Sequence, residues 1–149
     1  MEELLDLIKA ADDFYSMNGA DLSSVKQAEN KLGLIFADDY KEYVLAFGVA
    51  TFDGHELTGV CNSDRLSVVA TTKRARDFFP QFPEELYVVE EMQFDHILTV
   101  QDSTGAVFNY GPADEAKRIA GSLQEYLFPD SCKAESEEVV AEDNEVSEE

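Results

Sequence analysis

Two histidines that each lie beside acidic residues are the side chains in this sequence best suited to chemistry. His55 stands in the segment Asp-Gly-His-Glu at 53–56, and His96 follows Asp95. Brought together by the fold, two imidazoles and their neighbouring carboxylates could bind a divalent metal ion. A hairpin turn and a strand start that carry ordinary polar residues explain the same two patterns, and we favour this second interpretation. We therefore expect no metal ion and no other cofactor.

The motifs that mark common enzyme sites are missing from the sequence. It contains no G-x-S-x-G, no P-loop, no Rossmann glycine pattern and no His-Glu-x-x-His. Neighbouring carboxylates such as Glu90 and Glu91 are too frequent in so acidic a chain to indicate acid–base catalysis. Cys61 and Cys132 form no Cys-x-x-Cys pair, so a zinc ribbon or a redox motif has no support. We expect a protein without enzymatic activity.

The chain is strongly acidic, with 32 acidic and 11 basic residues and a formal net charge of −21. Residues 133–149 hold eight of the acidic residues and one lysine, a net charge of −7, which leaves −14 for residues 1–132. A field of this sign repels nucleic acid and anionic membranes and attracts basic proteins. It also keeps a protein dispersed, so solubility alone explains the charge too. We expect no direct contact with nucleic acid or membranes.

The composition predicts one packed domain followed by an acidic tail. The hydrophobic content is 44%, with 11% aromatic residues. Residues 133–149 contain three Val and no aromatic residue, which is too little apolar surface to offset the entropy of ordering. We therefore expect a domain at 1–132 and a disordered tail at 133–149. The N-terminal segment lacks the features of a signal peptide and no apolar run has membrane-spanning length, so we expect a cytoplasmic protein with reduced cysteines.

A helix–linker–helix–strand unit at 28–60 is expected to position the first histidine. Gly33 stands where the end of a helix requires a residue that tolerates positive φ. Asp38 or Asp39 can cap the next helix, whose apolar residues recur at spacings of three and four. The Asp-Gly dipeptide at 53–54 is a strong signal for a two-residue hairpin.

Spacing along the rest of the chain predicts further helices and strands. Ser122 and Glu125 have capping-box spacing and predict a closing helix. A basic cluster of Lys73, Arg74 and Arg76 suits the last turn of a helix, where it complements the dipole and forms ion pairs with the acidic surface. The other expected elements are helices at 2–15, from 21–24 to 32 and from 62–64 to 79, strands at 86–91, 97–101 and 106–110, and a short helix from Pro112 that carries Ala116, Ile119 and Ala120.

Residues 28–44 resemble the opening motif of the SUKH superfamily. The resemblance rests on the pattern Ala-Glu-x-x-Leu-Gly-Leu-x-Phe-x-x-Asp-Tyr-Lys-x-Tyr-Val. The Asp…Gly turn at 102–105 between two expected strands and the closing Ser-Leu-Gln-Glu-Tyr-Leu-Phe segment extend it, in scattered pieces, over residues 22–128. Two positions depart from the family pattern: Ala37 stands where Pro is common, and Phe-Gly-Val at 47–49 replaces Asn-Gly-Gly. Neither change removes the helix start or the helix stop.

This resemblance implies an α+β fold and a binding function. SUKH proteins include bacterial immunity proteins of polymorphic toxin systems and a yeast regulator of cell-wall synthesis. The implied fold is an antiparallel sheet of about four to six strands flanked by N-terminal, middle and C-terminal helices. The implied function is that of an immunity protein that binds and neutralises a cognate toxin of nuclease or deaminase type. The alternative is a scaffold or regulator that binds a peptide or protein partner unrelated to toxins.

The expected partner is a basic protein. Toxins that act on nucleic acid have basic substrate grooves, and carboxylates can occupy the positions of phosphates and steer association. The residues expected to contact this partner lie at the first hairpin and around the later strands, where side chains are exposed: Asp53, His55, Glu56, Glu90, Glu91 and Asp95.

Overall fold

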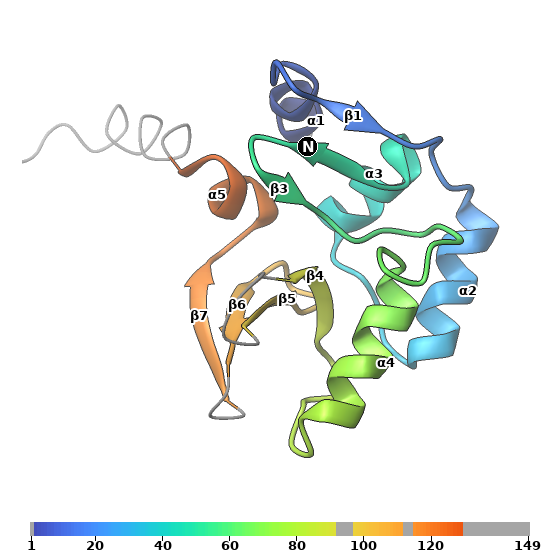
Figure 1. Ribbon diagram of the computed structural model, residues 1–149, viewed down its shortest axis with the longest axis vertical. Coiled ribbons are helices and arrows are strands. Elements are labelled where there is room, and N and C mark those ends of the chain that lie inside the picture. The colour runs from blue at the N-terminus through green and yellow to red at the C-terminus, as the bar shows by residue number, and fades with distance from the viewer. Residues whose placement is uncertain (1, 92–96, 112–114, 130–149) are drawn as a thin grey trace, which may run out of the picture.

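The computed structural model describes residues 2–91, 97–111 and 115–129, so Asp95, His96 and the expected tail at 133–149 lie outside the described residues. Within these ranges the chain forms five helices and seven strands (Figure 1), and the expected α+β class is confirmed. In chain order the elements are α1 (Glu2–Lys9), β1 (Tyr15–Ser16), α2 (Leu22–Leu32), α3 (Asp38–Phe47), β2 (Ala50–Phe52), β3 (His55–Glu56), α4 (Val68–Phe78), β4 (Tyr87–Glu91), β5 (Leu98–Gln101), β6 (Val107–Tyr110), β7 (Ala116–Ala120) and α5 (Leu123–Leu127).

The strands form two antiparallel sheets. The smaller sheet has the order β1-β2-β3 and the larger one the order β4-β5-β6-β7. The chain that leaves β3 joins the two, because Leu57 forms a bridge with Glu90 and the N–H of Thr58 donates to the carbonyl oxygen of Val89 at 2.8 Å. The first hairpin is therefore anchored to β4.

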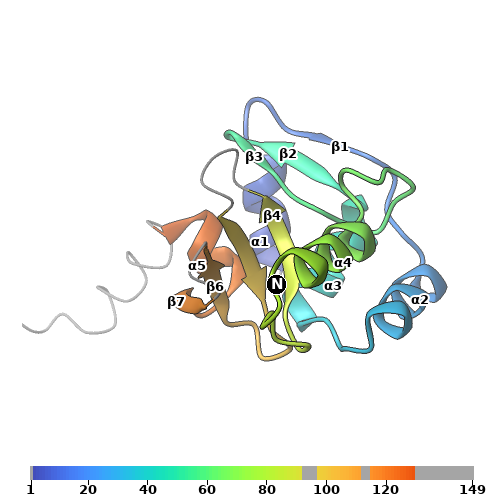
Figure 2. The same ribbon diagram turned by 60° about the horizontal axis from the view of Figure 1, so that its bottom comes forward.

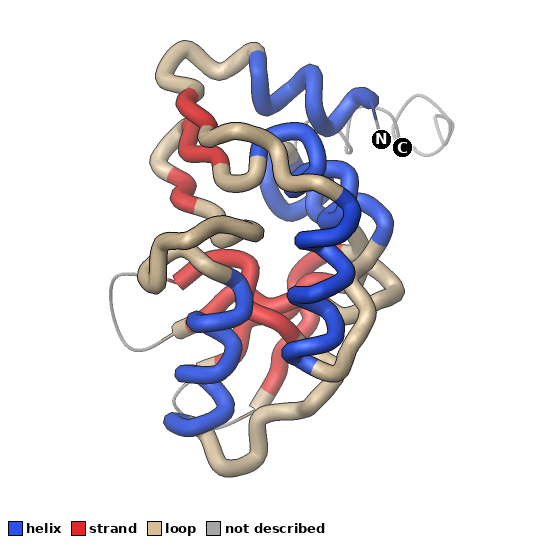
Figure 3. Tube along the Cα trace, turned by 90° about the vertical axis from the view of Figure 1, so that its right-hand side faces the viewer, coloured by secondary structure: helices blue, strands red, loops and turns tan. Residues whose placement is uncertain are grey.

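The helices are distributed around β4. Helices α2 and α4 lie on one side of this strand, and β7 and α5 lie on the other (Figures 1 and 2). Seen from the helical side, α2 and α4 lie side by side in front of the strands of the larger sheet (Figure 3). Helix α3 packs against both α1 and α2. The hairpin and the α2–α4 pair therefore present separate surfaces.

Three buried tyrosines connect α3 with the strands. The ring centroid of Tyr40 lies 5.6 Å from that of Tyr43 and 5.0 Å from that of Tyr87. Tyr40 shares a 2.9 Å hydrogen bond with Thr58 Oγ1, Tyr43 donates to the Thr58 carbonyl at 2.9 Å, and Tyr87 donates to Gln101 Oε1 at 2.6 Å. Because each buried hydroxyl has a partner, the polar cost of burial is offset and the chain after β3 is held in one position.

Local signals are confirmed at the hairpin and at two helix ends. Asp53 and Gly54 have φ values of 50° and 81° and join β2 to β3, as a turn with two positive φ angles requires. Gly33 ends α2 in the left-handed conformation with φ of 68°. Ser122 caps α5 by accepting the N–H of Glu125 at 3.1 Å.

Three expected helices differ from the observed ones. Helix α1 ends at Lys9, six residues before the expected end at residue 15, and α4 begins at Val68 with Ser67 as its N-cap instead of at 62–64. The helix expected from Pro112 is wrong, because Ala116–Ala120 form β7 and pair with β6. A helix as short as the one expected from Pro112 is marginal by itself, whereas β6 supplies backbone hydrogen-bond partners on an antiparallel strand.

Asp39 has a tertiary role instead of the expected capping role. The N-cap of α3 is Ala37, which makes no side-chain hydrogen bond to the helix. The carboxylate of Asp39 is buried and accepts the N–H of Leu123 at 2.9 Å and the side-chain amide of Gln101 at 3.0 Å. It therefore joins α3 to the first residue of α5 and to β5.

Candidate functional site

Glu90 in β4 joins three elements that are distant in the sequence. Its carboxylate accepts His55 Nδ1 at 3.1 Å, the N–H of Glu56 at 3.0 Å and the hydroxyl of Tyr126 at 2.6 Å. The residue is only 6% exposed. A β-bulge between Val88 and Glu90 precedes it, and bulges change the direction of the side chains that follow. One carboxylate thus connects the hairpin, the larger sheet and α5.

This network shifts the proton affinity of its members. The hydrogen bond to Glu90 raises the pKa of His55, and this effect exceeds the opposing effect of burial. Burial alone would raise the pKa of Glu90, but the hydrogen bonds from His55 and Tyr126 outweigh it and hold that pKa below its ordinary value. Burial and the negative charge of Glu90 raise the pKa of Tyr126. The arrangement therefore favours an ionised Glu90 opposite a protonated His55.

The ring of His55 is enclosed by two aromatic rings. Its centroid lies 5.6 Å from Phe52 and 5.7 Å from Tyr126, and its side chain keeps 26% of its surface exposed. The two ring contacts and the hydrogen bond to Glu90 restrict the orientation of the imidazole, which remains partly exposed to solvent. Such a histidine can stabilise the hairpin and present a positive charge at the surface.

The other predicted contact residues are more exposed, and their carboxylates have different partners. Asp53 is exposed at the tip of the hairpin. Glu56 forms a bidentate pair with Arg65 at 2.6 and 2.8 Å, which lowers the pKa of its carboxylate. Glu91 lies 3.7 Å from Arg74. The structure thus brings His55, Glu56 and Glu90 together and leaves Asp53 as the exposed carboxylate at the tip, while Asp95 falls outside the described residues.

Two contributors to this site were missed by reasoning from the sequence. The Asp13 carboxylate accepts the backbone N–H of Asp53 at 2.8 Å although 40 residues separate them, so a second exposed acidic residue lies at the tip of the hairpin. Tyr126 follows the capping box of α5, and its spacing within the helix gave no sign that its hydroxyl would meet Glu90. The sequence of so short a helix does not indicate where the hydroxyl of Tyr126 points. Tertiary packing alone decides this direction.

Within the described ranges, no group of three or more His, Cys, Asp or Glu side chains is arranged to hold a metal ion. The paired histidine site considered from the sequence is not tested by this finding, because His96 lies outside those ranges. Among the same residues, every helix is too short or too polar to cross a membrane.

Comparisons with known proteins give one family match and one shared fold. The family model SUKH_5, described as SMI1-KNR4 cell-wall, matches residues 1–129. A crystal structure of a protein from Pseudomonas syringae pv. tomato superposes with a TM-score of 0.70 at 15% identity, covering 85% of this chain and 94% of that chain. At this identity the likeness shows the fold alone. No curated protein matches the chain.

Proposed function

We propose, from the premise that this chain belongs to the SMI1-KNR4 family of the SUKH superfamily, that it is an immunity protein that binds and neutralises a cognate bacterial toxin. Membership supports a binding module of the regulatory or immunity type. The toxin in this proposal acts on nucleic acid, as a nuclease or a deaminase, and its substrate groove is basic. The protein acts by covering that groove, without catalysis of its own.

The observation that carries the proposal is the acidic tip of the first hairpin. The Asp13 carboxylate accepts the backbone N–H of Asp53, so two exposed acidic residues lie at this tip, on a chain whose residues 1–132 carry a net charge of −14. Exposed carboxylates on one surface of an acidic protein attract cationic groups of a partner. Lysine and arginine side chains of a nucleic-acid-binding groove supply such cations, because the carboxylates take the places of two phosphates.

The network below the tip supports the same proposal. His55 and Glu56 are fixed by Glu90, so the hairpin that carries Asp53 is held in one orientation before a partner arrives. Preorganisation of this kind reduces the entropy lost on binding. In the proposed complex the direct contacts to the toxin come from Asp13, Asp53, Glu56, Glu91 and Asp95, and His55 and Glu90 position the hairpin.

The first test is co-expression of this chain with the protein encoded by the adjacent reading frame, scored by growth and by co-purification. We expect the neighbour to be toxic alone, and this chain to restore growth and form a stable complex with it. A harmless neighbour and no complex would overturn the toxin proposal and favour a scaffold or regulator with another protein partner.

The second test measures the association rate of the complex at low salt. Asp13→Asn with Asp53→Asn removes two charges but keeps an acceptor for the hydrogen bond, and Asn tolerates the positive φ at residue 53. We expect association to slow about fivefold or more and its salt dependence to weaken. The control, Asp6→Asn with Asp77→Asn, removes two exposed charges elsewhere. Equal rates for both double variants would show that the hairpin tip is not the contact.

A further inference from the structure

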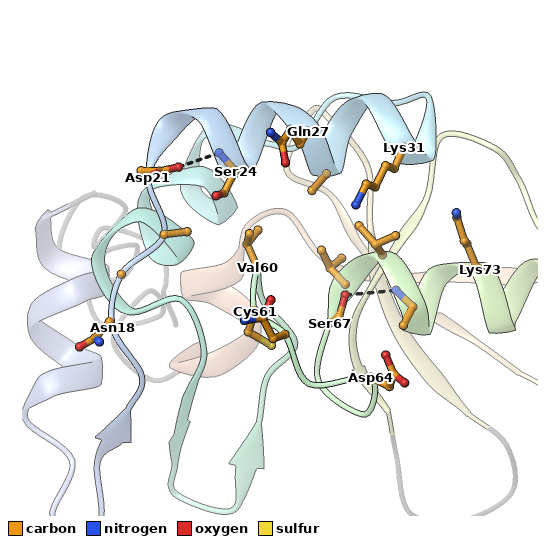
Figure 4. Close-up of a pocket in the computed structure, with 17 residues that line it drawn as sticks. Asn18, Asp21, Ser24, Gln27, Lys31, Val60, Cys61, Asp64, Ser67 and Lys73 are labelled. Carbon is orange, nitrogen blue, oxygen red and sulfur yellow. Dashed lines mark hydrogen bonds between the residues drawn. The ribbon is translucent and has the colours of Figure 1, made fainter.

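A second surface of different chemistry lies between α2 and α4. A groove of about 590 Å³ opens there, bounded by the two helices and by the segment 60–64 that precedes α4. Figure 4 shows Lys31 extending from α2 and Lys73 from α4 toward the space between the helices. Val60 and Cys61 line the groove from the segment that precedes α4. The groove does not include any residue of the hairpin at 50–56.

The two lysines of the groove have no acidic partner among the described residues. Three other cationic side chains do have one: Lys41 with Glu29, Arg65 with Glu56 and Arg74 with Glu91. Ion pairs with the acidic surface were expected for the basic cluster on α4, and Arg74 fulfils this expectation whereas Lys73 does not. Two ammonium groups without an acidic partner in the described part of the chain therefore line one groove of this acidic protein.

Two carboxylates, those of Asp21 and Asp64, line the groove as well. The Asp21 carboxylate caps α2 by accepting the N–H of Ser24 at 2.8 Å. Asp64 is exposed at the edge of the groove, on the loop before α4. Figure 4 places Asp21 at the end of the groove opposite Lys31 and Lys73. Asp21 is therefore separated from the two lysines along the groove, whereas Asp64 lies on the α4 side, in the same half of the view as the lysines.

The base of the groove is apolar. Ala28 and Val68 line it and are 4% and 0% exposed, and Val60 and Val69 line it as partly buried side chains. A free phosphate ion gains nothing from such a surface. The N-terminus of α4 does not offer a phosphate cradle either, because the side chain of its N-cap Ser67 already accepts the N–H of Ala70 at 3.3 Å.

We propose that this groove binds an acidic peptide segment of a protein partner. A carboxylate of the segment lies between Lys31 and Lys73, and an apolar side chain next to it covers the partly exposed Val60 and Val69. The lysines of this groove and the carboxylates of the hairpin tip allow one partner to be recognised by two patches, or two partners at once. The proposal does not depend on the toxin, and its test uses this protein alone.

The probe is a capped synthetic hexapeptide, Gly-Leu-Glu-Glu-Leu-Gly, added to the full-length ¹⁵N-labelled protein and followed by backbone amide chemical shifts. We expect saturable shifts at Lys31, Cys61 and Lys73 and none at the hairpin. Gly-Leu-Gln-Gln-Leu-Gly should bind at least about fivefold more weakly, because two exposed ion pairs are lost. An absence of shifts in the groove at millimolar peptide, or equal binding of both peptides, would overturn the proposal.

Matched substitutions on α2 and α4 locate the effect. Lys31→Gln with Lys73→Gln should reduce affinity for the acidic peptide at least about fivefold. The single variant Lys26→Gln should leave it unchanged, because Lys26 is exposed on α2 but does not line the groove. An equal loss with Lys26→Gln would mean that overall charge, not the groove, governs binding, and the proposal would fail.

A chemical readout at Cys61 distinguishes the possible occupants. In a Cys132→Ser background, the acidic peptide should slow alkylation of Cys61 by iodoacetamide, since the thiol lies in the groove. Protection by inorganic phosphate alone, at equal concentration, would identify an anion site and overturn the peptide proposal. Stronger binding of a synthetic peptide of residues 133–149 than of the hexapeptide would make this chain's own acidic segment the occupant and would overturn the external partner.

Discussion

Charge is used in opposite ways at the hairpin and in the groove between α2 and α4. The Glu90 carboxylate is 6% exposed and accepts hydrogen bonds from three groups, whereas Lys31 and Lys73 line an open groove without an acidic partner among the described residues. A buried charge must be paired because desolvation costs several kcal/mol, while an exposed lysine loses little by remaining unpaired. Burial and pairing therefore decide whether a charged side chain is available to bind a partner. The number of charges in the sequence does not reveal this.

The largest effect is expected from Glu90→Ala. This change leaves His55, the N–H of Glu56 and the hydroxyl of Tyr126 without their acceptor in a part-buried site, and we expect a loss of about 3 kcal/mol in the free energy of unfolding. Urea denaturation followed by circular dichroism measures it. Glu91→Ala, one residue further along β4, is the control and should cost less than about 1 kcal/mol because its pair with Arg74 is exposed. Equal losses of unfolding free energy in Glu90→Ala and Glu91→Ala would show that burial does not make the Glu90 carboxylate more important for stability than an exposed one.

A smaller effect is expected when pH changes the charge of His55. Its folded-state pKa is raised above the ordinary value of 6.5, so its contribution to stability is complete below that value and is lost as the pH rises through the folded-state pKa. Glu90 has a lowered pKa, so its contribution is present above 4.5 and is lost as the pH falls.

We therefore expect the free energy of unfolding to decrease between about pH 6 and pH 8.5. The variant His55→Gln should show a smaller decrease, because it cannot carry the charge that is lost. Urea titrations at both pH values measure the difference. An identical pH dependence in the two proteins would mean that another group is responsible and that His55 does not titrate against Glu90.

The smallest effect on stability is expected in the groove. Lys31→Gln with Lys73→Gln should change the free energy of unfolding by less than about 0.5 kcal/mol, because neither lysine has an acidic partner in the described part of the chain. The same urea titration serves for this variant. A loss above about 1 kcal/mol would show that the lysines support the fold, and the contrast with Glu90 would then disappear.

The sequence predicted those parts of the fold that depend on neighbouring residues. The hairpin at Asp53 and Gly54, the end of α2 at Gly33 and the cap of α5 at Ser122 are confirmed. Each of them rests on the conformational preference of one residue or on a hydrogen bond that spans three residues. Apolar periodicity likewise indicated the face of α3 that is buried.

The errors occur where a distant partner overrides the local preference. Ala116–Ala120 follow a helical pattern but form β7, since four of these five residues find backbone partners on β6. Asp39 stands at a plausible capping position but reaches Gln101 and Leu123 instead. In both cases the contact that decides the outcome is absent from the local sequence.

The sequence by itself determined the family, the α+β class and the acidic character of this protein, because these follow from residue types and their spacing. The tertiary structure decided which charges serve the fold and which remain available. Glu90 and Glu91 are adjacent and chemically identical, yet only Glu90 is buried beneath His55 and Tyr126. Glu90 is buried because the fold places His55, 35 residues away in the sequence, against its carboxylate. The cost of leaving the Glu90 charge unpaired follows from this burial.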